Sequence, residues 1–354
     1  MARKQGKRIT MKMVAEELGV SMMTVSRALN NSRYVEEGTR ERVVETARRM
    51  GYFPDHVAKS MVVRKTRTLG VVAPEIAHSF FPDAIRGVEE AATERDYQIM
   101  LTHSAEDEKR EENAVRTLVG KRVDGILISV AERSVDHEIY RQAVEAGVEI
   151  VFFDRCVFDL GYSCVSVNDK GNAFKMTEHL IKEHGYRRIA HLGGPERVSI
   201  GRDRRAGYLD ALRANECEAG EDSVVESGFH ERGGYEAMKR LLDLPDDRRP
   251  RAVVAVNDPA AFGAMKAIAE RGLRIPEDLA VVGFSNDIRS SLTPTPLTTV
   301  DQRPYEVGKR AAEKLVAHVE NEDEKPEAII LEGELVFRKS CGCPYDTKDN
   351  GYPF

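Results

Sequence analysis

Few residues of this 354-residue sequence stand in a spacing that supports catalysis. The nearest match to a nucleophile elbow is Gly283-Phe284-Ser285-Asn286-Asp287, but an aspartate stands where the Gly-x-Ser-x-Gly turn needs its second glycine. The glycine fingerprint of dinucleotide-binding proteins, the phosphate-binding loop and the His-Glu-x-x-His zinc motif do not occur. The sequence therefore predicts a binding protein without catalytic residues or a cofactor.

Histidine and cysteine, the usual zinc ligands, also occur in groups. His179, His184 and His191 are close in sequence, but spacings of five and seven residues do not place two of them on one helical turn. Cys341 and Cys343 have no second ligand pair near them in the sequence. We therefore interpret the histidines as structural and the cysteines as two free thiols, and predict no metal site.

The whole-chain composition is that of a folded protein of the cytoplasm. Hydrophobic residues make up 41% and charged residues 32%, and the length suits two or three domains. No apolar run approaches the roughly 20 residues that cross a bilayer, and no apolar core follows the basic N-terminal residues. The five cysteines are an odd number spread over a long chain, which argues against a disulfide framework and favours a reducing compartment.

Charge is distributed unevenly along the chain. Residues 1–67 contain 15 Lys and Arg against 7 Asp and Glu, a net charge of +8, whereas the rest of the chain has a net charge of −14. Because neutralising DNA phosphates releases counterions, a basic segment beside an acidic body indicates a nucleic-acid-binding head. A solvated basic tail is the alternative that composition alone leaves open.

Amphipathic segments within the basic part predict a helix-turn-helix domain. Thr10 is a suitable N-cap for a first helix that ends at Gly19, and Ser21 can cap a second helix over residues 22–29. A third helix is expected over residues 39–50. Three such helices can bury a small apolar core.

The order of these motifs resembles the lactose-repressor (LacI/GalR) family of bacterial transcription factors. The stretches "MVAEELGVSMMTVSRALN", "VEEGTRERVVETARRMGYFPDHVA" and "TLGVVAP" look like the head, hinge and first core strand of that family. The resemblance extends to about residue 340. It implies a helix-turn-helix head over residues 1–54, a hinge helix and linker over residues 55–68, a two-lobed core over residues 69–340 and a tail over residues 341–354.

The family pattern also implies which residues contact DNA. Met22, Met23 and Arg27 match side chains that read base edges in the major groove. Arg27 can bond guanine O6 and N7, whereas the methionines offer only apolar contact, for instance to a thymine methyl, or else pack on the surface without reading bases. The implied DNA-binding residues are Ser21, Met22, Met23, Thr24, Ser26, Arg27, Asn30, Tyr52 and, in the hinge, Met61.

Residues 55–61 have helical composition, and the basic residues around them suit a hinge helix that forms only on DNA. In the family, the paired hinge helices of a dimer insert an apolar wedge into the minor groove. Met61 stands at the wedge position. A flexible linker is the alternative.

From residue 69 onward, short apolar strands alternate with helical patterns, which predicts parallel, doubly wound α/β sheets of about five strands each. The resemblance implies a fold shared with periplasmic sugar-binding proteins. It assigns residues 69–163 and 292–324 to one lobe, and residues 164–291 and 325–340 to the other. A ligand is expected between the lobes, at the carboxyl ends of the strands.

An effector pocket in that cleft can be carried over from the family by position. Phe81 and Phe229 match its aromatic walls, with ordinary core packing as the alternative. After "VVGF" the family usually has an aspartate, and Ser285 stands there in this chain. The loss of this charge indicates a different ligand or a lower affinity for the ligand. The implied effector-binding residues are Phe81, Asp154, Arg204, Phe229, Asn257 and Ser285, where surface or interlobe ion pairs are the alternative for the polar members.

The sequence therefore predicts a dimeric DNA-binding transcription regulator, more readily a repressor than an activator. Its affinity for a palindromic operator would change when a small molecule, a sugar or sugar derivative, binds between the lobes. The tail after Val336 has no heptad pattern, so a dimer is expected instead of a coiled-coil-linked tetramer. Control by a protein partner, or no effector at all, is the main alternative; a sugar-binding transport protein or an oxidoreductase is a remote one.

Overall fold

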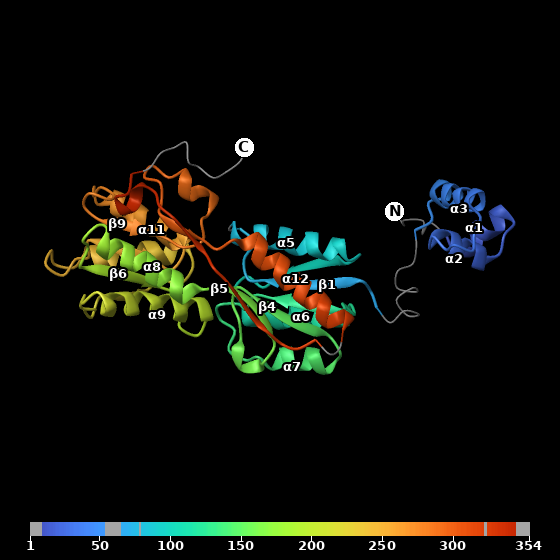
Figure 1. The fold of residues 1–354 in the computed structure, drawn as a ribbon, viewed down its shortest axis with the longest axis horizontal. Helices are drawn as coiled ribbons and strands as arrows, with labels where there is room; N and C mark the ends of the chain where they lie inside the picture. The colour runs from blue at the N-terminus through green and yellow to red at the C-terminus, as the bar shows by residue number, and fades with distance from the viewer. Residues whose placement is uncertain (1–8, 54–64, 78, 322–323, 345–354) are drawn as a thin grey trace, which may run out of the picture. The chain divides into compact units, whose positions relative to one another are not determined.

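The computed structural model describes residues 9–53, 65–77, 79–321 and 324–344. The chain forms two compact units that divide between Thr66 and Arg67. The first unit is all-α, and the second is an α/β body with two lobes (Figure 1). Met61 and the rest of the expected hinge helix lie outside the described residues.

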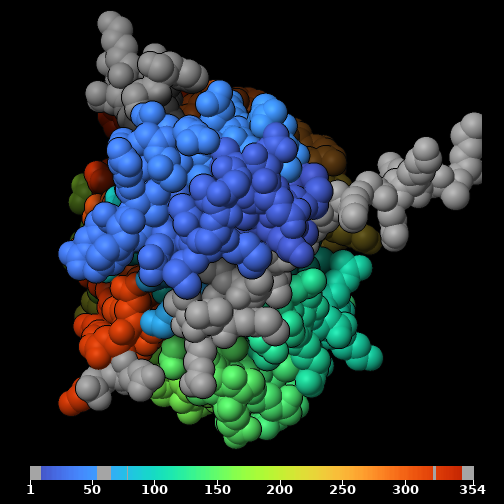
Figure 2. All heavy atoms as spheres, turned by 90° about the vertical axis from the view of Figure 1, so that its right-hand side faces the viewer, coloured from blue at the N-terminus to red at the C-terminus, as the bar shows by residue number. Residues whose placement is uncertain are grey.

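The first unit is built from α1 (Met11–Leu18), α2 (Met22–Leu29) and α3 (Glu37–Met50). Thr10 caps α1 by accepting a hydrogen bond from the Met13 amide, and Gly19 ends α1 with a φ of 66°, which glycine adopts without strain. The helices enclose a small core, and their blue spheres form one compact body in Figure 2. The expected helix-turn-helix is confirmed, with α3 beginning slightly earlier than expected.

The body contains one parallel sheet in each lobe. The first has six strands in the order β11-β5-β4-β3-β1-β2, and the second has four in the order β7-β6-β8-β9. The strands of the first sheet are β1 (Thr68–Ala73), β2 (Gln98–His103), β3 (Gly125–Ile128), β4 (Glu149–Phe153), β5 (Ser163–Val167) and β11 (Ala328–Leu331). Those of the second are β6 (Ile189–Gly193), β7 (Val224–Glu226), β8 (Ala252–Ala255) and β9 (Ala280–Val282). A separate antiparallel pair joins β10 (Thr299–Asp301) to β12 (Glu334–Val336).

Helices cover both faces of each sheet. The first sheet lies between one pair, α5 (Phe80–Glu94) and α12 (Pro304–Glu320), and another, α6 (Glu108–Gly120) and α7 (Glu138–Glu145). The second lies between α8 (Asp169–Lys182) with α9 (Ser199–Ala214) and α10 (Glu231–Leu242) with α11 (Asp258–Glu270). The inner strands are therefore buried on both faces, as parallel sheets require, whereas the edge strands β2, β7 and β11 are partly exposed. None of the helices in the described ranges is long and apolar enough to cross a membrane.

The lobe boundaries expected from the sequence are wrong around β5 and β11. These two strands pair in parallel, with Ala328 opposite Cys164, and both belong to the first sheet. The sequence assigns most of β5 and all of β11 to the second lobe and expects about five strands in each sheet. The difference arises because the chain leaves the first lobe only after β5 ends, and returns one more strand to it after α12.

The structure contains a disulfide that the cysteine count argues against. Cys156 and Cys164 are bonded, with their Cα atoms 6.1 Å apart. Cys164 lies in β5 opposite Phe152 of β4, and Cys156 follows β4 closely. An odd total says nothing about two cysteines that neighbouring strands bring together. Cys217, Cys341 and Cys343 are free.

The crossing of α5 and α12 depends on glycine. A Cβ on Gly87 would overlap the carbonyl oxygen of Tyr305, so alanine there forces the helices apart. We expect Gly87→Ala to lower the free energy of unfolding by about 1 to 3 kcal/mol, measured by urea denaturation. The matched control is Gly120→Ala, because a Cβ at the end of α6 meets no atom within 4 Å. Equal losses in both variants would contradict close packing at the crossing.

Candidate nucleic-acid interface and interlobe cleft

The outer face of α2 exposes large side chains that a folded domain would normally bury. Met22 and Met23 are 51% and 61% exposed, and Arg27 is exposed beside them, whereas Val25 and Ala28 are buried on the inner face. The structure thus leaves the three expected base-reading side chains together on the solvent side of the second helix. Such a face can enter a major groove without unfolding the domain.

The other expected DNA-binding residues of the head lie on or beside α2, except Tyr52, which follows α3. The Ser21 hydroxyl accepts from the Thr24 amide at 3.0 Å and lies 2.9 Å from the Thr24 hydroxyl. Asn30 donates to the carbonyl oxygen of Ser26 at 2.8 Å. Tyr52 is half-buried and packs on the core of the head. These contacts hold α2 in place. Contact of these residues with DNA stays a prediction.

Tyr34, which the sequence pattern did not single out, lies beyond the end of α2. Its ring is 71% exposed, with the guanidinium of Arg27 5.9 Å and that of Arg33 5.1 Å from the ring centroid. Arg33 also donates to the Tyr34 hydroxyl at 3.0 Å. An exposed tyrosine between arginines orients positive charge next to the reading face. The signal in the sequence was an aromatic residue next to arginine in a polar turn.

In the body, the structure brings all six expected effector residues around one cavity between the lobes. They come from α5, from the segment after β4, from α9, from the segment before α10, from the N-cap of α11 and from the segment after β9. Loop positions at the carboxyl ends of parallel strands are where α/β proteins bind ligands. The cavity is lined by Phe81, Asp154, Arg204, Phe229, Asn257 and Ser285, together with others that include Glu106, Arg155, Asp287 and Gln302.

Arg155 is the principal residue of the cleft that the sequence pattern did not indicate. Its guanidinium lies 4.5 Å from the ring centroid of Phe229 and 5.9 Å from that of Phe81. Its Nη1 donates to both carboxylate oxygens of Glu106, at 2.9 and 2.8 Å. Both charged groups are buried. Arg155 therefore occupies the space between the two aromatic walls and joins the first lobe to the second.

The cleft is closed around these side chains. The cavity has a volume of about 50 Å³, room for a few water molecules, whereas ligand pockets usually hold about 300 to 1,000 Å³. A larger groove of about 810 Å³ lies beside it and shares Glu106 and His230 with it. A ligand of sugar size enters the cavity only if Arg155 moves or the lobes separate.

Two buried nitrogen atoms in the cavity have no hydrogen-bond partner among the described residues. Arg204 donates from Nε to Asp169 and from Nη1 to the Val256 carbonyl oxygen, each at 2.7 Å, but its Nη2 has no partner. Arg155 Nε has none either, although Asp154 lies 3.8 Å from it. Unpaired buried donors cost free energy, and a ligand with hydroxyl or carboxylate oxygens can satisfy them.

Asp154 lies between these two arginines. Burial raises the pKa of its carboxyl group, and the charges of Arg155 and Arg204 oppose that rise. Among the described residues its carboxylate accepts one hydrogen bond, a long one of 3.5 Å from the Ser129 hydroxyl. The carboxylate is thus held more by charge than by hydrogen bonds, so it can accept from a ligand hydroxyl.

Asn257 and Ser285 have narrower roles than the family pattern implies. Asn257 caps α11 by accepting from the Ala260 amide and donates to the Phe229 carbonyl oxygen, both at 2.9 Å. It therefore positions the Phe229 wall and keeps one N–H for the cavity. Asp287 lies two residues beyond Ser285, but it is bonded to Arg289 at 3.0 Å. It does not supply a free carboxylate in place of the one missing at Ser285.

The structure also revises the interpretation of the histidines and cysteines. His191 is a core residue: its Nδ1 lies 2.8 Å from the Val254 carbonyl oxygen, and burial lowers its pKa to about 4. His179 and His184 instead lie next to Cys341 and Cys343. The expectation that these cysteines lack a second ligand pair is therefore wrong.

Comparison with known proteins identifies two family models in this chain. Residues 10–55 match the model of bacterial regulatory proteins, lacI family, and residues 177–341 match a periplasmic binding protein-like domain. The chain is 32% identical over 331 residues to the HTH-type transcriptional repressor PurR of Mannheimia succiniciproducens. That match covers 94% of this chain and 98% of the relative.

Solved structures of transcriptional regulators also resemble this chain over most of its length. The lac repressor dimer bound to operator and the anti-inducer ONPF has a TM-score of 0.83 and 26% identity, and covers 95% of this chain and 99% of its own. The complex of the transcriptional regulator CelR with cellobiose has a TM-score of 0.72 and 32% identity, and covers 94% of this chain and 100% of its own. The likeness therefore spans both units of the chain.

Proposed function

The chain belongs to the lacI family of bacterial regulatory proteins, and we propose that it is a cytoplasmic transcriptional repressor that binds a palindromic operator as a dimer. The observation that carries the proposal is the exposed face of α2, where Met22, Met23 and Arg27 stand free of the core of the head. In this proposal α2 enters the major groove, and the residues at its ends hold the DNA backbone.

We propose that the body responds to a sugar or sugar derivative in the interlobe cleft. Arg204 Nη2 and Arg155 Nε have no partner in the described part of the chain, and the Asp154 carboxylate is weakly bonded. These groups support this choice because they suit a ligand rich in hydroxyl groups. A ligand that binds one arrangement of the lobes better than another shifts the population of lobe arrangements, and with it the affinity for the operator.

In vitro selection with the full-length protein tests the DNA half of the proposal. A pool of random duplexes should become enriched in an inverted repeat whose half-sites lie about 10 base pairs apart, because a twofold dimer presents its two recognition helices one helical turn apart. Enrichment of an asymmetric site would refute the dimeric arrangement. Failure to enrich any sequence would refute specific DNA binding.

A thermal-shift panel of sugars, sugar acids and sugar phosphates tests the effector half. A ligand at a hundred times its Kd should stabilise the protein by about 2.7 kcal/mol. Asp154→Asn should weaken that ligand by about tenfold or more, because it removes a charged acceptor. The matched control is Asp159→Asn in an exposed turn close by, which should leave the shift unchanged.

A regulator of the same fold with a protein partner or no effector is the second candidate. The small volume of the closed cavity and the serine at position 285 favour it. It predicts that no compound in the panel raises the melting temperature of the wild-type protein, and that operator binding is unaffected by the same compounds.

A further inference from the structure

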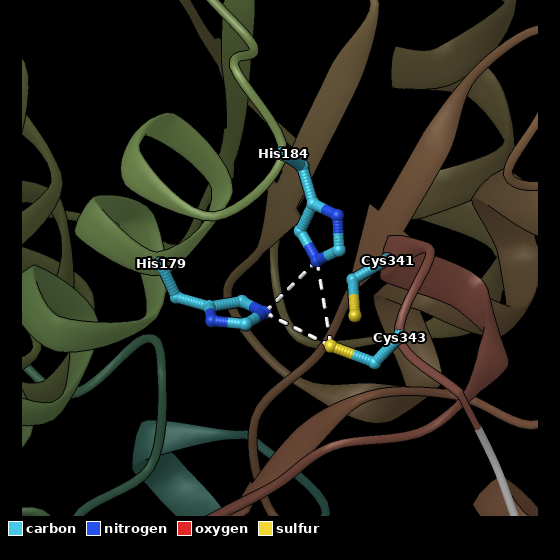
Figure 3. Close-up of side chains that lie close together, drawn as sticks. All are labelled: His179, His184, Cys341 and Cys343. Atoms are coloured by element: carbon cyan, nitrogen blue, oxygen red, sulfur yellow. Dashed lines mark hydrogen bonds between the residues drawn. The ribbon is translucent and has the colours of Figure 1, made fainter.

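Four side chains of metal-ligand type converge in the second lobe, far from the cleft residues in sequence. His179 lies near the end of α8 and His184 just beyond it, while Cys341 and Cys343 belong to the segment after β12 (Figure 3). Their ligand atoms all lie within 4.8 Å of one another. Two segments about 160 residues apart in the chain thus meet at one point.

The distances match the edges of a zinc tetrahedron. Bonds of about 2.0 Å to nitrogen and 2.3 Å to sulfur give edges of about 3.3 Å between nitrogens and 3.5 Å between nitrogen and sulfur. The two Nε2 atoms lie 3.2 Å apart, and Cys343 Sγ lies 3.4 Å from each of them. Cys341 Sγ, the fourth ligand atom, lies within 4.8 Å of the other three.

Hydrogen bonds between neutral groups can account for two of these three contacts, but not for all three at once. A neutral imidazole nitrogen carries either a proton or a lone pair, so the Nε2 atom of each histidine can donate or accept but not both. If His179 donates, its single proton faces two acceptors; His184 then has one lone pair for two donors. A cation at the centre would use the lone pairs of all three atoms at once.

The backbone turn between the two cysteines allows them to approach the histidines. Gly342 has a φ of 107°, and a Cβ on it would lie 3.2 Å from Nδ1 of His184, so glycine both forms the turn and makes room for the ring. The Thr298 hydroxyl lies 3.1 Å from Cys341 Sγ, where it can support a thiolate. Phe337 packs against His179 with ring centroids 4.2 Å apart.

We propose that His179, His184, Cys341 and Cys343 bind one Zn²⁺ ion, which fastens the segment after β12 to the end of α8. Two imidazoles and two thiolates form a common structural zinc set, and the borderline-soft sulfur and nitrogen donors disfavour magnesium and calcium. Both thiols lose their protons to solvent on binding. Because all four positions are filled by the protein, the site is structural and leaves no position for a substrate.

The test measures metal in full-length protein purified without a polyhistidine tag and in the presence of a non-thiol reductant. We expect about one zinc per chain by elemental mass spectrometry, and a loss of most of it in Cys343→Ser and in His184→Ala. The matched controls are Cys217→Ser, a free cysteine elsewhere in the same lobe, and His103→Gln, an exposed histidine of the first lobe. Both should retain the zinc of the wild type.

Cobalt replacement keeps the test decisive if a ligand variant fails to fold. Co²⁺ added to metal-free wild-type protein should give the strong visible absorption of a tetrahedral site and a thiolate charge-transfer band, and equimolar Zn²⁺ should abolish both. Wild-type protein that holds no more zinc than Cys343→Ser and gives no such cobalt bands overturns the proposal. A disulfide between Cys341 and Cys343 in freshly purified reduced protein also overturns it.

Discussion

Replacing Arg155 with methionine is expected to lower the free energy of unfolding by about 3 to 5 kcal/mol, although the two side chains have similar volumes. The substitution leaves the Glu106 carboxylate buried without its cation, whose Nη1 lies 2.9 and 2.8 Å from the two carboxylate oxygens. It also removes the opposing charge next to buried Asp154. Urea denaturation at pH 7 measures the loss.

The exposed pair of Arg141 with Glu138 provides the matched control. Arg141 Nη1 lies 3.1 Å from a carboxylate oxygen of Glu138, but both side chains are about half exposed. Surface pairs contribute about 0 to 1 kcal/mol, so Arg141→Met should be nearly neutral. The double variant Arg155→Met with Glu106→Gln should recover part of the loss, because it removes the orphaned charge. Similar losses for Arg155→Met and Arg141→Met would show that the buried Arg155–Glu106 pair stabilises the fold no more than a surface pair does.

The same variant has a distinctive dependence on pH. Burial alone would raise the pKa of Glu106, but the charge and hydrogen bonds of Arg155 hold that pKa below its ordinary value. The pair therefore stabilises the wild type above the ordinary glutamate pKa and loses that effect as pH falls through the lowered one. In Arg155→Met the pKa of Glu106 rises instead, so the gap in stability should narrow from pH 7 towards pH 4. A constant gap would contradict this account.

Local pattern predicted the helix-turn-helix well because its determinants lie within a few residues of one another. Thr10, Gly19 and Ser21 cap or end helices through their own side chain or backbone conformation. Arg155 illustrates the opposite case. A charged residue after a strand normally points to solvent, but Arg155 is buried by groups that are distant in sequence, among them Glu106 and, from the other lobe, Phe229.

Long-range pairing explains the remaining errors. In the sequence, neither the cysteines at positions 341 and 343 nor His179 and His184 have further metal-ligand residues nearby. The fold brings the two pairs together. The lobe boundary near β5 failed for a similar reason, since its place in the first sheet depends on pairing with β11 far along the chain. Spacing rules detect neither kind of contact.

Replacing Met22, Met23 and Arg27 together with alanine is expected to remove operator discrimination while leaving the head folded. Alanine has the highest helix propensity, and all three side chains are exposed, so α2 should persist. Loss of an arginine that bonds guanine costs about 1 to 3 kcal/mol in each half-site. With the apolar contacts also lost, we expect specificity to fall by about 3 to 6 kcal/mol across the dimer.

Titration of the selected operator and of a scrambled duplex at several salt concentrations separates base reading from phosphate contact. Binding to the scrambled duplex should persist, because the electrostatic part of the affinity depends on the remaining basic residues. The control is Arg49→Ala on α3, an exposed arginine paired with Glu17, which should affect both duplexes equally. If the triple variant also weakens both duplexes equally, α2 contacts only the DNA backbone, and the residues that read bases lie elsewhere in the chain.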